Sequence, residues 1–371
     1  MLVELVGEPV VMEPIVDEVE RIRHAWLTLN RQCNLRCHWC YAHSTEYRKT
    51  DDMPRKLAEQ IINFLSKLQL EYVFLIGGEP TYYPFLEGVI RQIHTCGMKA
   101  FLLTNGLALS QRRYLDRLIE AGLAGVNLSM KGWSPESYAQ NTGVNAYETM
   151  RRALRNIAES PIESLASFVI SAENVDFYLN AVSEARAQGV KHIYLSFEHD
   201  FSALDGKGTS QDLSKIFYMI QRFAESYDTL QRITNGNFIL HQSYPLCIWE
   251  KSLIQKLTDN HQIQTSCQLL ERTGLVFDTD GSLIPCNSMY QVSIGKFGVD
   301  FSSKQSFETF WCSNRICTIY ERFAALPSNT CCGCIEQARC GGGCIANWFT
   351  HDLEYWKNAA ATYLQGNISL K

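Results

Sequence analysis

The chain lacks several features that would point to a membrane or a nucleic acid as partner. Its net charge is −5, and no block of like charges interrupts the sequence. A basic surface for nucleic acid is therefore not expected. The first residues, Met1–Pro9, are acidic and lack both the cationic segment of a signal peptide and the long apolar run of a membrane span. We expect a cytoplasmic protein with neither kind of partner.

Composition points to a folded protein with an unusual number of thiols. The chain has 371 residues, 46 % hydrophobic and 20 % charged, which suits one large or two medium domains with a proper core. Fourteen cysteines would suit a small secreted disulfide scaffold. In a chain of this size, clustered at metal-ligand spacings, they indicate metal chemistry in a reducing cytosol.

The first cysteine cluster lies near the N-terminus. Cys33, Cys37 and Cys40 follow the spacing C-x3-C-x2-C, directly after an apolar run at Ala25–Leu29 that predicts a strand. Three thiolates on a cubane iron–sulfur cluster leave one iron open, where a reactant can bind. The alternative is zinc, with His38 or His43 as a fourth ligand.

A second motif follows the next predicted strand. Gly77-Gly78-Glu79-Pro80 comes directly after Tyr72–Ile76. Two glycines allow backbone to approach a ligand closely, because no Cβ intervenes. A carboxylate at this place can accept hydrogen bonds from an ammonium group.

Strand-like and helix-like runs alternate from residue 25 to about residue 200, which predicts parallel strands joined by right-handed helical crossovers. The predicted strands are Ala25–Leu29, Tyr72–Ile76, Ala100–Thr104, Gly125–Ser129, Ser167–Ser171 and His192–Ser196. The predicted helices are Pro54–Leu68, Phe85–Cys96, Gln111–Ala121, Ala146–Glu159 and Asp176–Gln188. Six such units form an α/β fold, a partial (β/α)6 barrel that resembles a TIM barrel open on one side. Ligands of such barrels bind at the carboxyl ends of the strands.

With these motifs the chain resembles radical S-adenosylmethionine (radical SAM) enzymes. The resemblance implies a [4Fe–4S] cluster on Cys33, Cys37 and Cys40, with SAM bound to the open iron. Reductive cleavage of SAM, with an electron from a flavodoxin- or ferredoxin-type reductant, would give a 5′-deoxyadenosyl radical that abstracts hydrogen from the substrate. The positions that the resemblance assigns to SAM binding are Trp39, Tyr41, Gly77, Gly78, Glu79, Ser129, Lys131, Ser171 and Leu195. For Lys131 a solvated surface charge is an alternative, and a serine at a strand end commonly caps a helix.

The remaining cysteines are concentrated in the C-terminal part. Cys267 and Cys286 have the spacing C-x13-G-x4-C, and Cys331, Cys334, Cys340 and Cys344 have the spacing C-x2-C-x5-C-x3-C. This pattern resembles the SPASM extension of radical SAM enzymes, a small cysteine-rich SPASM/twitch domain with two auxiliary clusters. The resemblance assigns Cys267, Cys286 and Cys344 to the first cluster and Cys331, Cys334 and Cys340 to the second.

Both auxiliary clusters are one ligand short in this sequence. The seventh cysteine that ends the SPASM pattern is absent, because no cysteine follows Cys344. His351, Asp352, Cys332 or an open iron could complete the second cluster, and Cys247, Cys312 and Cys317 are spare candidates for the first. A zinc ribbon on Cys331, Cys334, Cys340 and Cys344 is the alternative for this half.

These patterns divide the chain into four parts. We expect an N-terminal extension over 1–24, the radical SAM barrel over 25–205, a helical bridge over 206–260 and the SPASM-type domain over 261–371.

The resemblance also suggests a peptide or protein as substrate. Auxiliary clusters that accept an electron favour a cross-linked or dehydrogenated product over an epimerised one. Asn287 follows Cys286 where sulfatase-maturing relatives carry an aspartate base, and an amide cannot take a proton at neutral pH. Only 24 residues precede the first predicted strand, so a separate protein would present a leader peptide, or the barrel would bind the substrate directly. The alternatives are a small-molecule dehydrogenase and a non-catalytic iron–sulfur or zinc module for electron transfer or assembly.

Overall fold

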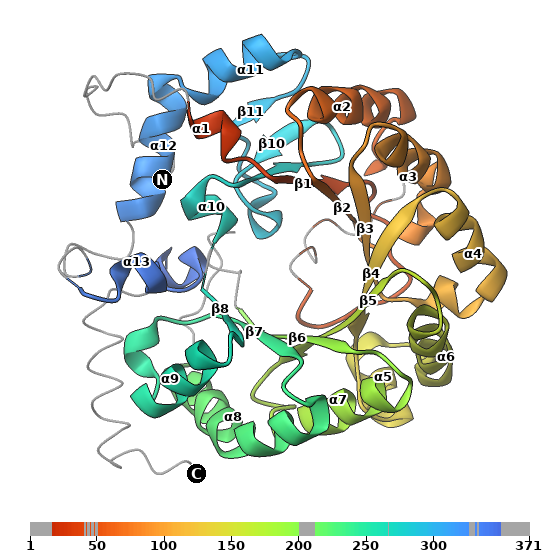
Figure 1. Cartoon of the computed structure of the whole chain (residues 1–371), viewed down its shortest axis with the longest axis vertical. Helices are drawn as coiled ribbons and strands as arrows, with labels where there is room; N and C mark the ends of the chain where they lie inside the picture. The colour runs from red at the N-terminus through yellow and green to blue at the C-terminus, as the bar shows by residue number, and fades with distance from the viewer. Residues whose placement is uncertain are drawn as a thin grey trace.

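One curved sheet surrounded by helices forms the body of the protein (Figure 1). The computed structural model describes residues 17–40, 42, 45, 48, 51–199, 212–265, 267–325, 331 and 334–349. Within them the sheet has eleven strands in the order β11-β10-β9-β1-β2-β3-β4-β5-β6-β7-β8. Strands β1 to β8 are parallel neighbours, β9 runs parallel to β1, and β10 and β11 continue antiparallel.

The strands alternate with helices through the first half of the chain and become short in the second. The strands are β1 (His24–Thr28), β2 (Tyr72–Ile76), β3 (Lys99–Thr104), β4 (Leu123–Met130), β5 (Glu163–Ile170), β6 (His192–Phe197), β7 (Phe238–His241), β8 (Ile263–Gln264), β9 (Gly274–Phe277), β10 (Ser282–Ile284) and β11 (Gly295–Lys296).

The helices cover the outside of the sheet because each has one apolar face. In α2 the buried side chains include Ala58, Ile61, Ile62 and Leu65, which recur at helical spacing. The helices are α1 (Asp17–Glu20), α2 (Arg55–Lys67), α3 (Leu86–Thr95), α4 (Arg112–Glu120), α5 (Pro135–Thr142), α6 (Tyr147–Ala158), α7 (Tyr178–Ala187), α8 (Leu213–Thr234), α9 (Lys251–Asp259), α10 (Gln268–Glu271), α11 (Lys304–Trp311), α12 (Asn314–Ala325) and α13 (Gln337–Cys340). None of the helices in the described part of the chain is both long and apolar enough to span a membrane.

The predicted partial barrel is confirmed, and the structure adds to it. Strands β1 to β6 coincide with the six predicted strands to within a few residues at each end. The structure also has α5, which the sequence analysis did not predict, and it extends the parallel sheet through β7 and β8. Strand β7 lies inside the segment that was expected to be a helical bridge. Strands of four and two residues are too short to show a period in the sequence, and they are held by pairing with β6 and with each other.

The two faces of the barrel strands differ in character. Side chains on the outer face, such as Leu27, Leu75 and Leu102, are completely buried under the helices. The inner face holds an aromatic layer near the amino ends of the strands, where the rings of Trp26 and Phe74 stack with centroids 4.5 Å apart. Smaller polar side chains follow toward the carboxyl ends. The barrel therefore has a closed floor and a hollow above it, at the end where the connecting loops lie.

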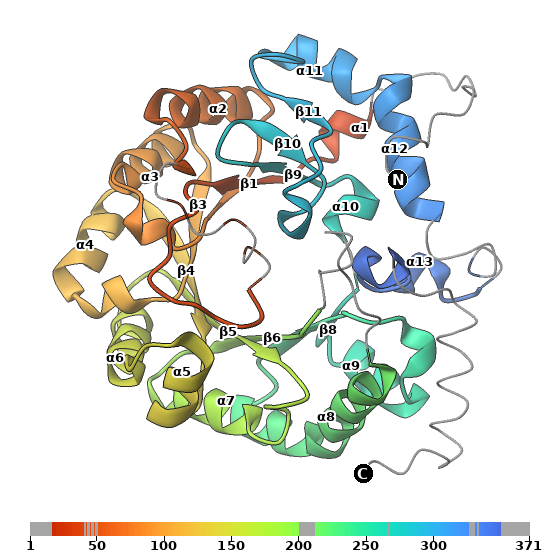
Figure 2. The ribbon, with the colours of Figure 1, turned by 180° about the vertical axis from the view of Figure 1, so that it is seen from behind.

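The C-terminal elements occupy the side on which the barrel sheet stays open. Helices α10, α12 and α13 lie between the β1 and β8 sides in both views (Figures 1 and 2). Because β9 pairs with β1, the second half of the chain continues the sheet of the first half. Both halves are thereby placed to contribute to one site.

Candidate active site and cysteine clusters

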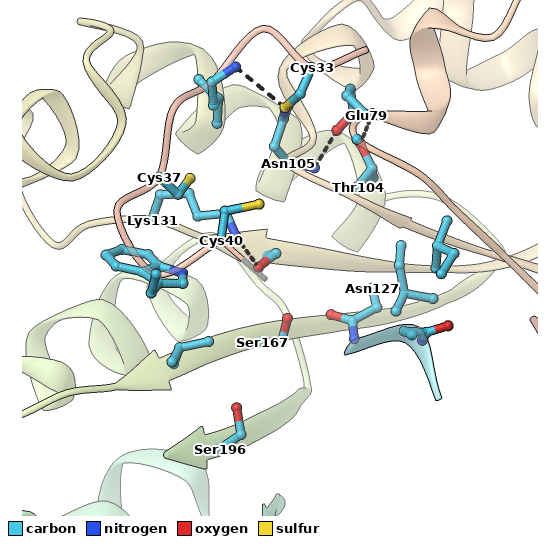
Figure 3. Close-up of a pocket in the computed structure, with 18 of the residues that line it drawn as sticks. Cys33, Cys37, Cys40, Glu79, Thr104, Asn105, Asn127, Lys131, Ser167 and Ser196 are labelled. Atoms are coloured by element: carbon cyan, nitrogen blue, oxygen red, sulfur yellow. Dashed lines mark hydrogen bonds between the residues drawn. The ribbon is translucent and has the colours of Figure 1, made fainter. Parts of the chain in front are cut away.

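The loop after β1 carries three cysteines over the mouth of the barrel. Cys33, Cys37 and Cys40 line a cavity of about 440 Å³ at the carboxyl ends of the strands (Figure 3). Backbone groups shape the loop, since Cys40 N donates to Cys37 O at 3.1 Å and Arg36 N donates to Thr142 O at 3.0 Å. The loop is thus tied to α5 while its three sulfur atoms face one hollow.

The thiols of this loop are in a partly desolvated environment. Burial raises the pKa of Cys33 to about 11, and burial also raises the pKa of Cys37. Without a nearby cation such thiols are protonated at neutral pH, and they become ligands when a metal centre displaces the protons. No three or more Cys, His, Asp or Glu side chains among the described residues are grouped closely enough for a single metal ion, so three thiols around this hollow fit a larger iron–sulfur group rather than one ion.

The Gly-Gly-Glu motif packs directly against this loop. Gly78 N donates to Asn30 O at 2.9 Å, and Glu79 N donates to Gln32 O at 2.8 Å. A Cβ on Gly78 would lie 2.3 Å from Arg31 O, which no side chain tolerates. The protein's own backbone therefore makes a close approach that requires glycine at this position. Gly77 and Gly78 also line the cavity.

Glu79 is a buried carboxylate, 1 % exposed, that joins β2 to β3. Its Oε1 accepts from Thr104 Oγ1 at 2.6 Å and from Thr81 Oγ1 at 2.7 Å, and its Oε2 accepts from Asn105 N at 2.8 Å. Burial raises the pKa of Glu79, and the hydrogen bonds, first among them that from Thr104, oppose the rise. A carboxylate oxygen has two lone pairs, so Oε2 retains one acceptor position beside the cavity.

Three further residues predicted to contact SAM lie together beneath the cysteine loop. Lys131 Nζ donates to Ser129 Oγ at 2.7 Å and lies 5.9 Å from the centre of the Trp39 ring. The positive charge of Lys131 also opposes the rise in the pKa of Cys37 that burial causes. Lys131 therefore points into the site rather than to bulk solvent. Tyr41, also predicted to contact SAM, lies outside the described residues.

Ser171 and Leu195 do not line the cavity, contrary to the sequence prediction. Leu195 is fully buried under the helices and pairs with Phe168 across the two strands. Ser171 lies in the turn after β5, where its N–H donates to Asn174 Oδ1 at 2.9 Å. Side chains alternate between the faces of a strand, which puts Leu195 on the opposite face from Tyr194 and Ser196, and Ser171 lies past the end of β5. Ser167 and Ser196 occupy the inner positions on β5 and β6.

A wall of neutral polar side chains faces the cysteine loop, and of these the sequence analysis singled out only Asn287. These residues are Asn127, Ser167, Tyr194, Ser196, His241 and Asn287. The acidic Glu198 also lines the cavity. Polar residues at alternate positions of apolar strands were the available signal. No described residue donates a hydrogen bond to the buried Asn127 Oδ1 or Asn287 Oδ1. Asn287 comes from the second half of the chain. Two buried amide oxygens without donors fit a cavity that receives a polar ligand.

Two histidines at the same end of the barrel are held uncharged. Burial lowers the pKa of His199 to about 3, with a further lowering by His241 and an opposing hydrogen bond to Asn347. Burial also lowers the pKa of His241. Both imidazoles line the cavity, so both are neutral there at pH 7.

A buried ion pair anchors the cysteine loop to the second half of the chain. The side chains of Arg31 and Asp278 form a salt bridge and are 4 % and 14 % exposed. The guanidinium group of Arg31 also lies 5.0 Å from the centre of the Tyr290 ring. The residue that begins the cysteine loop is thus held by the segments that flank β10.

The second group of cysteines surrounds a separate cavity of about 840 Å³. Its described cysteines are Cys247, Cys267, Cys331, Cys334 and Cys340. The three cysteines predicted for the second auxiliary cluster, Cys331, Cys334 and Cys340, thus line one cavity. Cys247 lines it too, as does Cys267, which was predicted for the first auxiliary cluster. Cys286 lies near Cys267, since the charge of Cys267 adds to the rise in the pKa of Cys286, to about 11, that burial causes. Several thiols around a hollow of this size fit a polynuclear iron–sulfur group.

The remaining cysteines lie apart from that cavity or outside the described residues. Cys344 is placed by its backbone N–H, which donates to Ser243 O at 3.0 Å. Neither Cys312 nor Cys317 lines the larger cavity, and Cys96 lies beside Asn63 on the outside of the barrel. Cys332, His351 and Asp352 fall outside the described residues.

Comparison with known proteins gives similarity over the barrel. The family described as the radical SAM superfamily matches residues 27–176. A probable GTP 3′,8-cyclase of Sulfurisphaera tokodaii is 26 % identical over 211 residues, which are 55 % of this chain and 64 % of that protein. The chain thus matches less than two thirds of that relative's length.

Solved structures show the same fold over nearly the whole chain. SuiB of Streptococcus suis, bound to the precursor peptide SuiA, aligns with a TM-score of 0.65 and 15 % identity over 88 % of this chain and 72 % of SuiB. Native anSMEcpe with bound AdoMet and the Cp18Cys peptide aligns with a TM-score of 0.66 and 16 % identity over 92 % and 95 % of the two chains. The barrel, the cysteine loop at its mouth and the match over residues 27–176 lead to one conclusion: this chain contains a radical SAM domain, followed by a cysteine-rich C-terminal region.

Proposed function

We propose that the protein is a radical SAM oxidoreductase that acts on a peptide or protein substrate. One observation carries the proposal: three cysteine thiols, the Lys131–Ser129 pair and a wall of neutral polar side chains all face the same cavity. A cysteine loop suited to a metal centre and a surface suited to an uncharged polar substrate would thus share one open cavity (Figure 3).

Residues of the barrel would hold the cofactors on the side of the cavity where the cysteine loop lies. Cys33, Cys37 and Cys40 would bind a [4Fe–4S] cluster, which together with SAM supplies a 5′-deoxyadenosyl radical for hydrogen abstraction. Lys131 lies beside Cys37 and can pair with the carboxylate of a bound SAM. The carbonyl oxygens of the Gly77–Gly78 turn and the free position on Glu79 Oε2 can accept from its ammonium group.

The neutral polar wall of the cavity suits a peptide substrate better than a nucleoside triphosphate. Lys131 is the single lysine or arginine among the described residues that line this cavity. A triphosphate needs several cations to offset its charge. Amide and hydroxyl groups such as those of Asn127, Ser167 and Asn287 suit the backbone amides and small polar side chains of a peptide. The peptide in the SuiB structure is consistent with this substrate class in the same fold.

We expect the overall reaction to be an oxidation of the substrate by two electrons. One hydrogen atom would leave the substrate to form 5′-deoxyadenosine, one proton would pass to solvent or to a neutral imidazole, and one electron would pass to an auxiliary cluster. His241 lines the cavity and is uncharged, so it can accept a proton. Auxiliary clusters in the C-terminal cysteine region and an external flavodoxin- or ferredoxin-type reductant are part of the proposal.

Anaerobic reconstitution with iron and sulfide tests the class of the enzyme. The dithionite-reduced protein should release 5′-deoxyadenosine from SAM, and Cys33→Ala, Cys37→Ala and Cys40→Ala should each reduce this release by at least about 100-fold. Cys96→Ala, on the outside of the barrel, is the matched control and should leave the release unchanged. Equal activity in the triad variants and the control would refute the proposal.

Substrate class is tested by mass spectrometry with two kinds of candidate. Synthetic peptides encoded by short reading frames next to the gene should stimulate 5′-deoxyadenosine release and lose about two mass units, the mass of two hydrogens. GTP should neither be consumed nor stimulate the reaction. The proposed substrate class would be wrong if the enzyme converted GTP and none of these peptides stimulated 5′-deoxyadenosine release.

A further inference from the structure

The strand β7 and the turn after it pack tightly against the last cysteine loop. Cys344 N donates to Ser243 O at 3.0 Å, and Gln242 Nε2 donates to Cys340 O at 2.9 Å. A Cβ on Gly343 would lie 2.6 Å from the backbone carbon of Tyr244, so the two segments touch backbone to backbone. Residues 242–246 and 340–344 therefore form one unit despite being about a hundred residues apart.

Within this unit the sulfur of Cys340 receives two N–H groups. Leu246 N lies 3.3 Å and Gln242 Nε2 lies 3.4 Å from Cys340 Sγ. Hydrogen bonds of this kind stabilise the thiolate of a cysteine that binds an iron–sulfur cluster. The next residue in the chain, Cys247, lines the same cavity as Cys340.

The local structure orients Cys247 toward the cysteines of the C-terminal loop. It is the middle residue of the 3-10 turn Leu246–Ile248, whose outer two side chains are both buried in the core. Cys247 is exposed and lines the larger cavity together with Cys331, Cys334 and Cys340. Two buried neighbours fix the turn, and the cysteine between them faces the hollow.

We propose that Cys247 is the fourth thiolate ligand of the cluster that Cys331, Cys334 and Cys340 bind. The assignment rests on the auxiliary clusters of the proposed function. It adds to the three cysteines of the C-terminal loop a fourth that precedes them by more than eighty residues in sequence and lines the same cavity. Each of the four thiols loses its proton to solvent when it binds iron, and this ligation step by itself changes no oxidation state. Cys267 lines the same cavity but lies near Cys286, which assigns it to the other group.

Iron content and spectroscopy of the reconstituted full-length protein test the assignment. Cys247→Ala and Cys340→Ala should each lose about one third of the iron, or show the same altered signal of one cluster in the electron paramagnetic resonance spectrum of the reduced protein. Cys247→Ser, which keeps an oxygen ligand, should retain the iron with a shifted signal. Cys96→Ala should match the wild type, and circular dichroism of each variant should show an intact fold.

The outcomes separate failure of this assignment from failure of the proposed function. If Cys340→Ala loses iron while Cys247→Ala matches Cys96→Ala, then Cys247 is not a ligand. Two other outcomes would also overturn the assignment. In the first, Cys247→Ala changes the same cluster signal as Cys286→Ala, so that Cys247 belongs to the other cluster. In the second, Cys332→Ala reproduces the effect of Cys340→Ala and Cys247→Ala does not. If Cys340→Ala also matches the wild type, the auxiliary cluster itself is absent.

Discussion

Gly78 and Gly88 show how differently two glycines of one barrel depend on their surroundings. Gly78 is in contact with the backbone of the cysteine loop, where a Cβ would meet Arg31 O and Gln32 O at 2.3 and 2.4 Å. Gly88 lies on the exposed side of α3, and a Cβ there would meet nothing within 4 Å. The first glycine is required by packing, and the second is not.

Alanine at these two positions should change stability in opposite directions. Gly78→Ala should lower the free energy of unfolding by more than about 2 kcal/mol, because backbone must move to admit the methyl group. Gly88→Ala should raise it by about 0.5 kcal/mol, because alanine loses less entropy than glycine in a helix. Urea titrations followed by circular dichroism measure both, and a stable Gly78→Ala variant would show that the loop is not packed as described.

His199 should make the protein less stable in mild acid. Its folded-state pKa of about 3 lies below its ordinary value of 6.5, so the folded state binds fewer protons than the unfolded chain. The free energy of unfolding therefore falls as the pH drops below 6.5, by about 1.4 kcal/mol from this group between about pH 7.5 and pH 5.5.

Substitution of His199 isolates this contribution from those of other histidines. The pKa values of His24 and His241 are also lowered by burial, so they contribute in the same direction and remain in the variant. His199→Gln cannot titrate and should reduce the pH dependence of the urea midpoint over this range. An unchanged dependence in the variant would mean that His199 is not buried as a neutral group.

Among the elements, the cysteine loop and the segment after β9 depend on one another through a buried charge pair. Arg31 begins the loop, and Asp278 directly follows β9, which itself pairs with β1. The pair is almost entirely removed from water, so loss of one partner leaves an uncompensated charge. The position of the metal-binding loop is thus partly set by the second half of the chain.

Removal of one charge of this pair should destabilise the protein strongly. Asp278→Ala should lower the free energy of unfolding by about 3–5 kcal/mol. Arg112→Ala is the control, because the Arg112–Asp116 pair is exposed and should contribute less than about 1 kcal/mol. Urea midpoints of the two variants provide the comparison, and similar small shifts in both would refute a structural role for the buried pair.

Strand positions were easier to predict than strand faces. Apolar runs that alternate with helical segments located β1 to β6, and glycines marked the ends of helices α3, α4 and α7, where Gly97, Gly122 and Gly189 adopt positive φ. The sequence of these strands did not show which side chains point into the barrel, so the prediction assigned Leu195 to the site and left out Ser196. A shift of one residue exchanges the two faces of a strand, and only the packing of helices against one face decides between them.

At the scale of the whole molecule, iron would join segments that the chain itself leaves far apart. Strand β7 follows the long helix α8, whereas Cys331, Cys334 and Cys340 lie near the C-terminus. The described contacts at this junction are hydrogen bonds and the close backbone approach at Gly343, with no strand pairing. A cluster that bridges Cys247 and the C-terminal loop would add covalent ties across this junction. The barrel sheet, by contrast, is held by continuous pairing from β1 to β8.

Removal of iron by chelation should therefore loosen the junction more than the barrel. Amides of residues 242–246 and 340–348 should exchange hydrogen at least about tenfold faster in the iron-free protein, whereas amides of β3, β4 and β5 should keep their protection. Hydrogen exchange measured by mass spectrometry distinguishes the two regions. Uniform protection before and after chelation would show that no metal group stabilises this junction.

The sequence alone determined which chemical groups the protein carries. These are three thiols directly after a strand, a Gly-Gly-Glu turn after the next strand, and six further cysteines at the spacings C-x13-G-x4-C and C-x2-C-x5-C-x3-C. These features are local, and residue order within a few positions is enough to define them. Only the tertiary structure decided which distant segments meet, such as Asn287 with the barrel wall, Arg31 with Asp278 and Leu246 with Cys340. Contacts of that kind depend on how helices and strands pack over the whole core, and no short stretch of sequence records them.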